Sequence, residues 1–200
     1  MTTVAMFPLG SVLMPHMPLP LRVFESRYLE MLRVILADEP SEFGVVLIER
    51  GQEVGGGDVR VDLGTLAQIG SIDTSGESIL LIAQGVRRIR VTRWIDEAVY
   101  PQADVEDLPD PAWSPELAPL LERADRAVRR VLREAEEAGE ELRWPADVGL
   151  DDDPAAAAWQ LAAIAPLGPL DQLDLLGSTS IERLLRRTIE LTEDAEALYT

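Results

Sequence analysis

Residues 7–32 constrain the fold of this chain more than any other segment, because prolines separate a short apolar strand from an amphipathic helix. The strand is predicted over residues 4–9. The prolines are Pro8, Pro15, Pro18 and Pro20. Proline fixes φ and lacks a backbone donor, so this segment must run extended along the edge of a sheet. The helix is predicted from apolar residues at helical spacing, which are Tyr28, Leu29, Leu32, Ile35 and Leu36.

The chain is strongly acidic, with 36 acidic and 18 basic residues among 200 and a net charge of −18. This charge repels phosphate backbones, which makes nucleic acid a poor candidate partner. Every basic residue is arginine, cysteine is absent, and His16 is the single histidine. The missing lysine and cysteine exclude a Walker A lysine, a Ser-Lys dyad, Schiff-base chemistry and a thiol nucleophile. We therefore expect no catalytic residues, no metal site and no cofactor.

The apolar content of 46% is typical of a folded, soluble chain with a substantial core. The N-terminal residues lack the features of a secretory signal. The longest apolar stretch, residues 155–167, is too short to span a bilayer. We therefore expect a cytoplasmic protein without a membrane partner.

The first half of the chain reads as short strands with one helix. Residues 44–50 form a near-continuous apolar run that suits a buried strand, and residues 63–73 and 78–84 flank a predicted hairpin turn. A further strand is expected over residues 99–105. Five or six such strands around one helix suit a closed or nearly closed barrel.

The second half reads as helices, beyond a boundary at Leu108-Pro109-Asp110-Pro111. Ser114-Pro115-Glu116 is a strong helix start, and the helix can extend to Gly139. Further helices are predicted from Asp153 to Pro166, over residues 170–176, and from a capping box at residues 179–182. The fold class is therefore α+β, with a barrel over residues 1–108 and a helical bundle over residues 109–200.

Three motifs suggest ligands, and each has a simpler structural explanation. The Gly55-Gly56-Gly57-Asp58 loop lacks the following helix that a phosphate site needs, so a hairpin loop is favoured. Asp151, Asp152 and Asp153 lack the spacing of a calcium loop, and Asp153 suits a helix cap. The arginines of residues 87–93 suit a solvated strand face paired with acids such as Glu97 or Asp104, and RNA binding is the less favoured alternative.

The chain resembles the N-terminal, substrate-binding domain of Lon protease. That family typically reads FPL-x-x-x-V-L-F-P-G-x-x-L-P-L-x-I-F-E-P-R-Y at its start. The matching residues are Phe7, Pro8, Leu9, Val12, Leu13, Pro15, Leu19, Pro20, Leu21, Phe24, Glu25, Arg27 and Tyr28. Further matches lie at residues 43–48, 64–67, 85–91, 171–176 and 183–184. His16 stands where the family usually has glycine, and Ser26 where it has proline.

The resemblance implies a PUA-like barrel and recognition of polypeptide, namely unfolded or damaged segments, without the ATPase and peptidase of full-length Lon. Clients or a protease or chaperone are the implied partners, with an adaptor role in protein quality control. A PUA-like RNA-binding module and a hydrolase using His16 or an acid pair are the alternatives.

The candidate binding surface lies on the proline-rich segment, because methionine adapts to many partner shapes. Its residues are Leu13, Met14, His16, Met17 and Leu19. If this assignment is right, Met14 or Met17 should be exposed to solvent. The alternative is that both methionines fill gaps in the core.

Overall fold

The computed structural model describes residues 2–37, 39–50, 59–75, 78–95 and 99–197. The chain divides after Pro109 into two compact units, which we call the strand unit (Met1–Pro109) and the helical unit (Asp110–Thr200). The fold is mixed α+β, with a six-stranded sheet and five helices.

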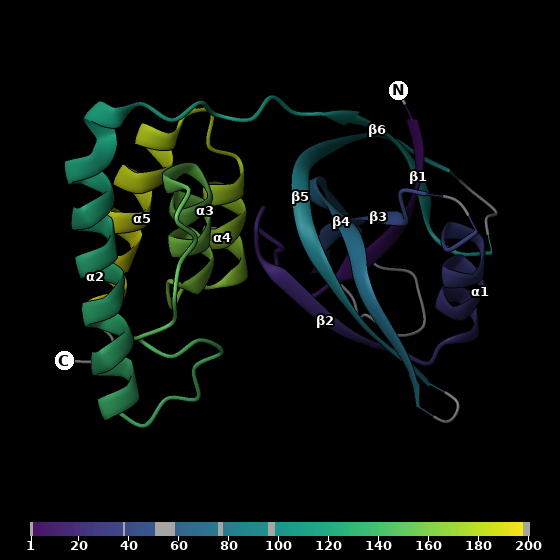
Figure 1. The fold of residues 1–200 in the computed structure, drawn as a ribbon, viewed down its shortest axis with the longest axis horizontal. Helices are drawn as coiled ribbons and strands as arrows, with labels where there is room; N and C mark the ends of the chain where they lie inside the picture. The colour runs from purple at the N-terminus through teal and green to yellow at the C-terminus, as the bar shows by residue number, and fades with distance from the viewer. Residues whose placement is uncertain (1, 38, 51–58, 76–77, 96–98, 198–200) are drawn as a thin grey trace. The chain divides into compact units, whose positions relative to one another are not determined.

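Within the described ranges, the strand unit contains one helix and six strands (Figure 1). The elements are β1 (Thr2–Leu9), β2 (Pro18–Val23), α1 (Ser26–Ile35), β3 (Glu42–Arg50), β4 (Val59–Ser75), β5 (Ser78–Ile95) and β6 (Gln102–Asp107). The strand order is β2-β5-β4-β3-β1-β6, and β5 also pairs with β6. Five strands therefore pair in a ring, and β2 lies beside β5 outside it. All pairs are antiparallel except β1 with β3.

Apolar side chains from five strands fill the interior of the strand ring. They are Met6, Val46, Leu66, Ile89, Val91, Ala103 and Val105. Gly44 leaves room for the Met6 side chain, whose sulfur and methyl group occupy the space that a Cβ at this position would take. A separate aromatic contact joins α1 to β1. Tyr28 of α1 stacks on Phe7 of β1, with 4.0 Å between the ring centroids. This contact explains why Tyr28 is buried on an otherwise amphipathic helix.

The expectation that all four prolines lie along a sheet edge is correct only in part, because Pro8 lies within β1, which pairs with both β3 and β6. The rest of the proline-rich segment leads to the edge of the sheet. Its last part is β2, which pairs with β5 alone. The segment enters β2 through His16, whose φ of 63° lies in the left-handed region. Glycine is the residue that most readily adopts this conformation, and histidine is among the other residues enriched there. A backbone requirement therefore explains why the Lon pattern usually has glycine at this position.

The described part of the helical unit contains a short 3-10 turn and four α-helices. They are η1 (Pro115–Leu117), α2 (Ala118–Glu137), α3 (Pro154–Ile164), α4 (Pro169–Leu176) and α5 (Ile181–Glu196). The helix α5 packs against α2, α3 and α4. Asp153 caps α3 by accepting a hydrogen bond from the backbone N–H of Ala155 at 3.3 Å, which confirms the predicted cap.

Two predicted helix starts are wrong in detail. Ser114 makes no side-chain capping bond, and the chain enters α2 through the 3-10 turn. The cap of α5 is Ser180 and not Thr179, because Ser180 Oγ accepts from the backbone N–H of Arg183 at 3.1 Å. Glu182 is therefore not in the position that a capping box needs.

Candidate functional site

The residues proposed from sequence as a binding surface are mostly buried. Met14 and Met17 are only 1% and 7% exposed, Leu13 and Leu19 are also buried, and His16 is half-buried. The expectation that Met14 or Met17 would be exposed is therefore wrong. Burying a methionine side chain contributes about 1.5–3 kcal/mol, so both residues serve the core. Their assignment to a client-binding surface depended on exposure to solvent, which the structure does not show.

Backbone contacts explain why this segment is held inside the strand unit. Thr65 Oγ1 donates to the carbonyl oxygen of Leu13, and His16 N–H donates to the carbonyl oxygen of Gly85 at 2.8 Å. Gly85 N–H donates back to Met17 at 2.9 Å. A Cβ on Gly85 would overlap the Met14 carbonyl oxygen, so glycine is required for this close approach. These contacts draw the segment against β5, away from solvent.

A different apolar surface is exposed, on the outer face of β2, β5 and β4. Leu80 and Ile82 of β5 are 41% and 52% exposed. Ile82 lies opposite Pro20 of β2, and Leu80 lies opposite Arg22. Together with β4 they line a shallow, mainly apolar hollow of about 470 Å³. We call this surface the apolar hollow; its lining is Pro20, Leu21, Arg22, Ser71, Ile72, Asp73, Leu80, Leu81 and Ile82.

The apolar hollow arises because β5 is apolar on both faces over this stretch. Leu81 and Ala83 point inward and are buried, while Leu80 and Ile82 point outward. A strand with one wet face would alternate apolar and polar residues. Residues 79–83 read Ile-Leu-Leu-Ile-Ala instead. That uninterrupted apolar run, on one strand of the predicted hairpin, was the signal in the sequence that could have located this surface.

The charges beside the apolar hollow are of both signs. Arg22 and Asp73 lie on either side of Leu80, one on each neighbouring strand. Arg22 Nε donates to Ser78 Oγ at 3.3 Å, which holds the guanidinium near the β5 end of the strand pair. The surface therefore offers an apolar floor with one basic and one acidic flank, an arrangement suited to a peptide.

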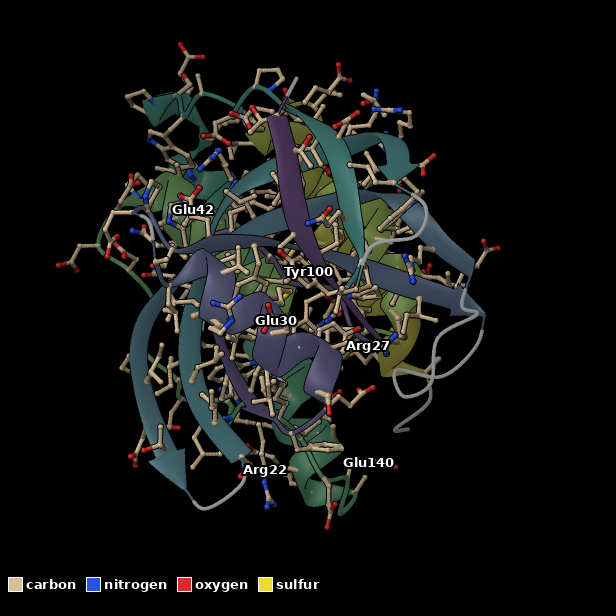
Figure 2. All side chains as sticks on the ribbon, turned by 90° about the vertical axis from the view of Figure 1, so that its right-hand side faces the viewer. Arg22, Arg27, Glu30, Glu42, Tyr100 and Glu140 are labelled. Atoms are coloured by element: carbon tan, nitrogen blue, oxygen red, sulfur yellow. The ribbon has the colours of Figure 1, made fainter. Side chains whose placement is uncertain are left out.

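A second hollow, of about 540 Å³, lies elsewhere on the strand unit and is charged. Arg87 donates to both carboxylate oxygens of Glu42 at 3.1 Å and to Asp107 at 3.1 Å. The hydrogen bond to Glu42 is the main cause that raises the pKa of Arg87 above its ordinary value. Figure 2 shows Glu42 far from Arg22, so the two hollows are separate sites. The charges of Arg87 are satisfied within the protein.

The arginine cluster that suggested RNA is engaged in similar pairs. Arg93 donates to Asp104 at 2.7 Å, which confirms the predicted partner, whereas Glu97 lies outside the described residues. Arg88 is buried and donates to the Pro109 carbonyl oxygen at 2.7 Å. With Arg87 paired to Glu42, three of the four arginines are directed at the protein itself, which removes most of the basic patch an RNA site would need.

The described residues give no support to a metal site or a membrane-spanning helix. Within those ranges, no group of three or more His, Asp or Glu side chains is arranged to hold a metal ion. The helices that the structure describes include none long and apolar enough to cross a membrane. The Gly55–Asp58 loop lies outside the described residues.

Comparisons with known proteins agree on one family. The sequence pattern of the "ATP-dependent protease La (LON) substrate-binding domain" matches residues 3–194. A Lon N-terminal domain protein from Xanthomonas campestris is similar in structure, with a TM-score of 0.68 and 27% identity, covering 95% of this chain and 98% of that one. The N-terminal domain of Lon protease from the Mycobacterium avium complex has a similar fold, with a TM-score of 0.66, 18% identity and coverage of 96% and 99%. No curated protein matches the chain.

Proposed function

Because the chain belongs to the LON substrate-binding domain family, we propose that this substrate-recognition module binds unfolded or damaged protein segments without catalysing a reaction. The observation that carries the proposal is the apolar hollow. Soluble domains rarely leave contiguous apolar surface exposed without a partner, and Leu80 and Ile82 are exposed on adjacent outward positions of one strand.

The composition supports a binding role over a catalytic one. Lysine and cysteine nucleophiles are absent from the sequence. His16 is fixed on the proline-rich segment by its backbone, among residues that pack into the core. Binding through apolar contacts needs no cofactor, and the high negative charge keeps the free module soluble while it exposes an apolar surface. We propose that the module acts in the cytoplasm as an adaptor, passing clients to a protease or chaperone.

The architecture suits this role if the two units are separate subdomains. We propose that residues 1–108 form a PUA-like barrel and residues 109–200 a helical bundle. The ring of strand pairings supports the first assignment, and the contacts of α5 with the three other α-helices support the second.

The test is a double substitution, Leu80→Ser with Ile82→Ser, measured by fluorescence anisotropy with reduced, carboxymethylated lactalbumin. We expect the affinity to fall at least about tenfold, because the variant lacks two apolar side chains whose burial in the complex would favour binding. Val99→Ser is the matched control, since Val99 is also exposed but lies outside the apolar hollow. Unchanged affinity in the double variant, with a normal melting temperature, would contradict the proposed site.

A further inference from the structure

The edge of β2 is closed to a further strand by its prolines. Gly85 exchanges hydrogen bonds with residues 16 and 17, so the odd-numbered residues of β5 near this end point their backbone groups toward β2. Their partners on β2 are also odd-numbered, and the even positions face away from β5. Two of those outward positions are Pro18 and Pro20, which have no N–H to donate. An incoming strand would find few donors there.

The edge of β4 near the hairpin is open. On β5 the even residues bond toward β4, so Ser71 with Ile82 and Asp73 with Leu80 are the hydrogen-bonded pairs. Ile72 and Thr74 therefore direct their N–H and C=O groups away from β5. The strand β3 ends its pairing at Gln68, and Ile69 N–H donates to Ser41. Among the described residues no strand other than β5 pairs with β4 beyond this point, so the opposite edge of β4 has no partner strand there.

The open edge of β4 adjoins the apolar hollow. Ser71, Ile72 and Asp73 of β4 belong to its lining. A strand added beside β4 would place alternate side chains along the rim of the apolar hollow, next to Asp73. An alternating row of backbone donors and acceptors is matched by an extended polypeptide and by few other ligands. The acidic side chain of Asp73, in a chain of net charge −18, favours a basic residue beside it.

We propose that the client adds to the sheet as an extended strand along Ile72 and Thr74, with an apolar residue pattern and a basic side chain at Asp73. This inference rests on the proposed function and specifies its binding mode. It explains how a module can accept many sequences, because main-chain hydrogen bonds supply affinity that does not depend on the side chains. The closed edge of β2 leaves β4 as the edge for this addition within the described residues.

The test uses Thr74→Pro, which removes the outward N–H of residue 74, just as Pro18 and Pro20 leave β2 without outward N–H groups. Thr74→Val is the matched control, since it keeps the N–H and the size of the side chain. The probe is the peptide acetyl-Val-Thr-Val-Arg-Val-Thr-Val-amide, with binding followed by calorimetry and folding followed by the melting temperature. We expect Thr74→Pro to weaken binding at least about threefold relative to Thr74→Val, as loss of one hydrogen bond predicts. Equal affinities in two folded variants would overturn the proposal.

A second arm does not depend on how well Thr74→Pro folds. The unaltered protein is given the same peptide with N-methyl groups on residues two to six, which blocks both edges and keeps every side chain. Strand addition predicts loss of binding, whereas equal binding of both peptides would overturn it. If lactalbumin binding is lost in the Leu80 and Ile82 double variant but the methylated peptide still binds, the proposed function stands and strand addition fails. Self-association of the chain that Thr74→Pro abolishes, with no peptide binding, would overturn the inference in favour of a second copy at this edge.

Discussion

The strand unit and the helical unit differ in how many large apolar side chains they expose to solvent. Among the described residues, eight of the nine exposed large hydrophobic side chains belong to the strand unit, and Leu170 is the exception. The helices cover their outer faces with ion pairs instead, such as Arg130 with Glu196 and Arg187 with Asp174. The helical unit therefore exposes little large apolar surface among its described residues, whereas the strand unit leaves several apolar side chains in contact with water, as the proposed client site requires.

The largest effect expected from this comparison separates core from surface within the strand unit. Met14→Ser should lower the free energy of unfolding by about 2–5 kcal/mol, because it removes a buried side chain and leaves a cavity. Ile82→Ser should change it by less than about 0.5 kcal/mol, as is usual for surface substitutions. Denaturant titration measures both. If Ile82→Ser proves as costly as Met14→Ser, the exposed hydrophobic side chains belong to the fold and the contrast between the units fails.

An intermediate effect is expected in the helical unit, where stability depends on local capping. Ser180→Ala should lower the free energy of unfolding by about 1 kcal/mol, because the backbone N–H of Arg183 loses its acceptor. Thr179→Ala should have a much smaller effect, since Thr179 is one residue outside the cap. Thermal unfolding compares the two variants. A larger loss from Thr179→Ala would restore the capping box predicted from the sequence.

The smallest effect concerns the surface pair of Arg130 and Glu196, whose side chains make two hydrogen bonds of 2.9 Å. The hydrogen bond from Arg130 lowers the pKa of Glu196 below its ordinary value. A carboxyl with a lowered folded pKa stabilises the fold above its unfolded pKa, and this contribution disappears as the pH falls through the folded pKa. In Arg130→Gln, an NMR titration should find the pKa of Glu196 closer to the ordinary value. An unchanged titration would show that the pair does not form in solution.

Much of the fold could be predicted from local sequence rules. Pro18 and Pro20 required an edge position, and β2 is an edge strand. Asp153 before Pro154 predicted a helix cap, which the structure contains. These predictions succeeded because each depends on one residue and its immediate backbone. The cap at Thr179 failed because the choice between neighbouring hydroxyl residues depends on where packing makes the helix begin.

The candidate site could not be predicted in the same way. Methionines in a proline-rich segment suggested an adaptable surface, but exposure depends on what packs over a residue. Gly85 admits the backbone of Met14 at close range, and Thr65 binds the carbonyl oxygen of Leu13, so this segment is drawn inward. Both contacts join residues more than fifty positions apart along the chain, and no local pattern encodes them.

The sequence by itself determined the family, the edge strand and the absence of lysine and cysteine chemistry, because these follow from residue identity and short-range geometry. Tertiary structure decided which apolar residues face water. The pairing of β5 with β2 and β4 put Leu81 inside and Leu80 and Ile82 outside, although all three belong to one apolar run. The physical reason is that a strand has two faces, and only its neighbours determine which face is buried.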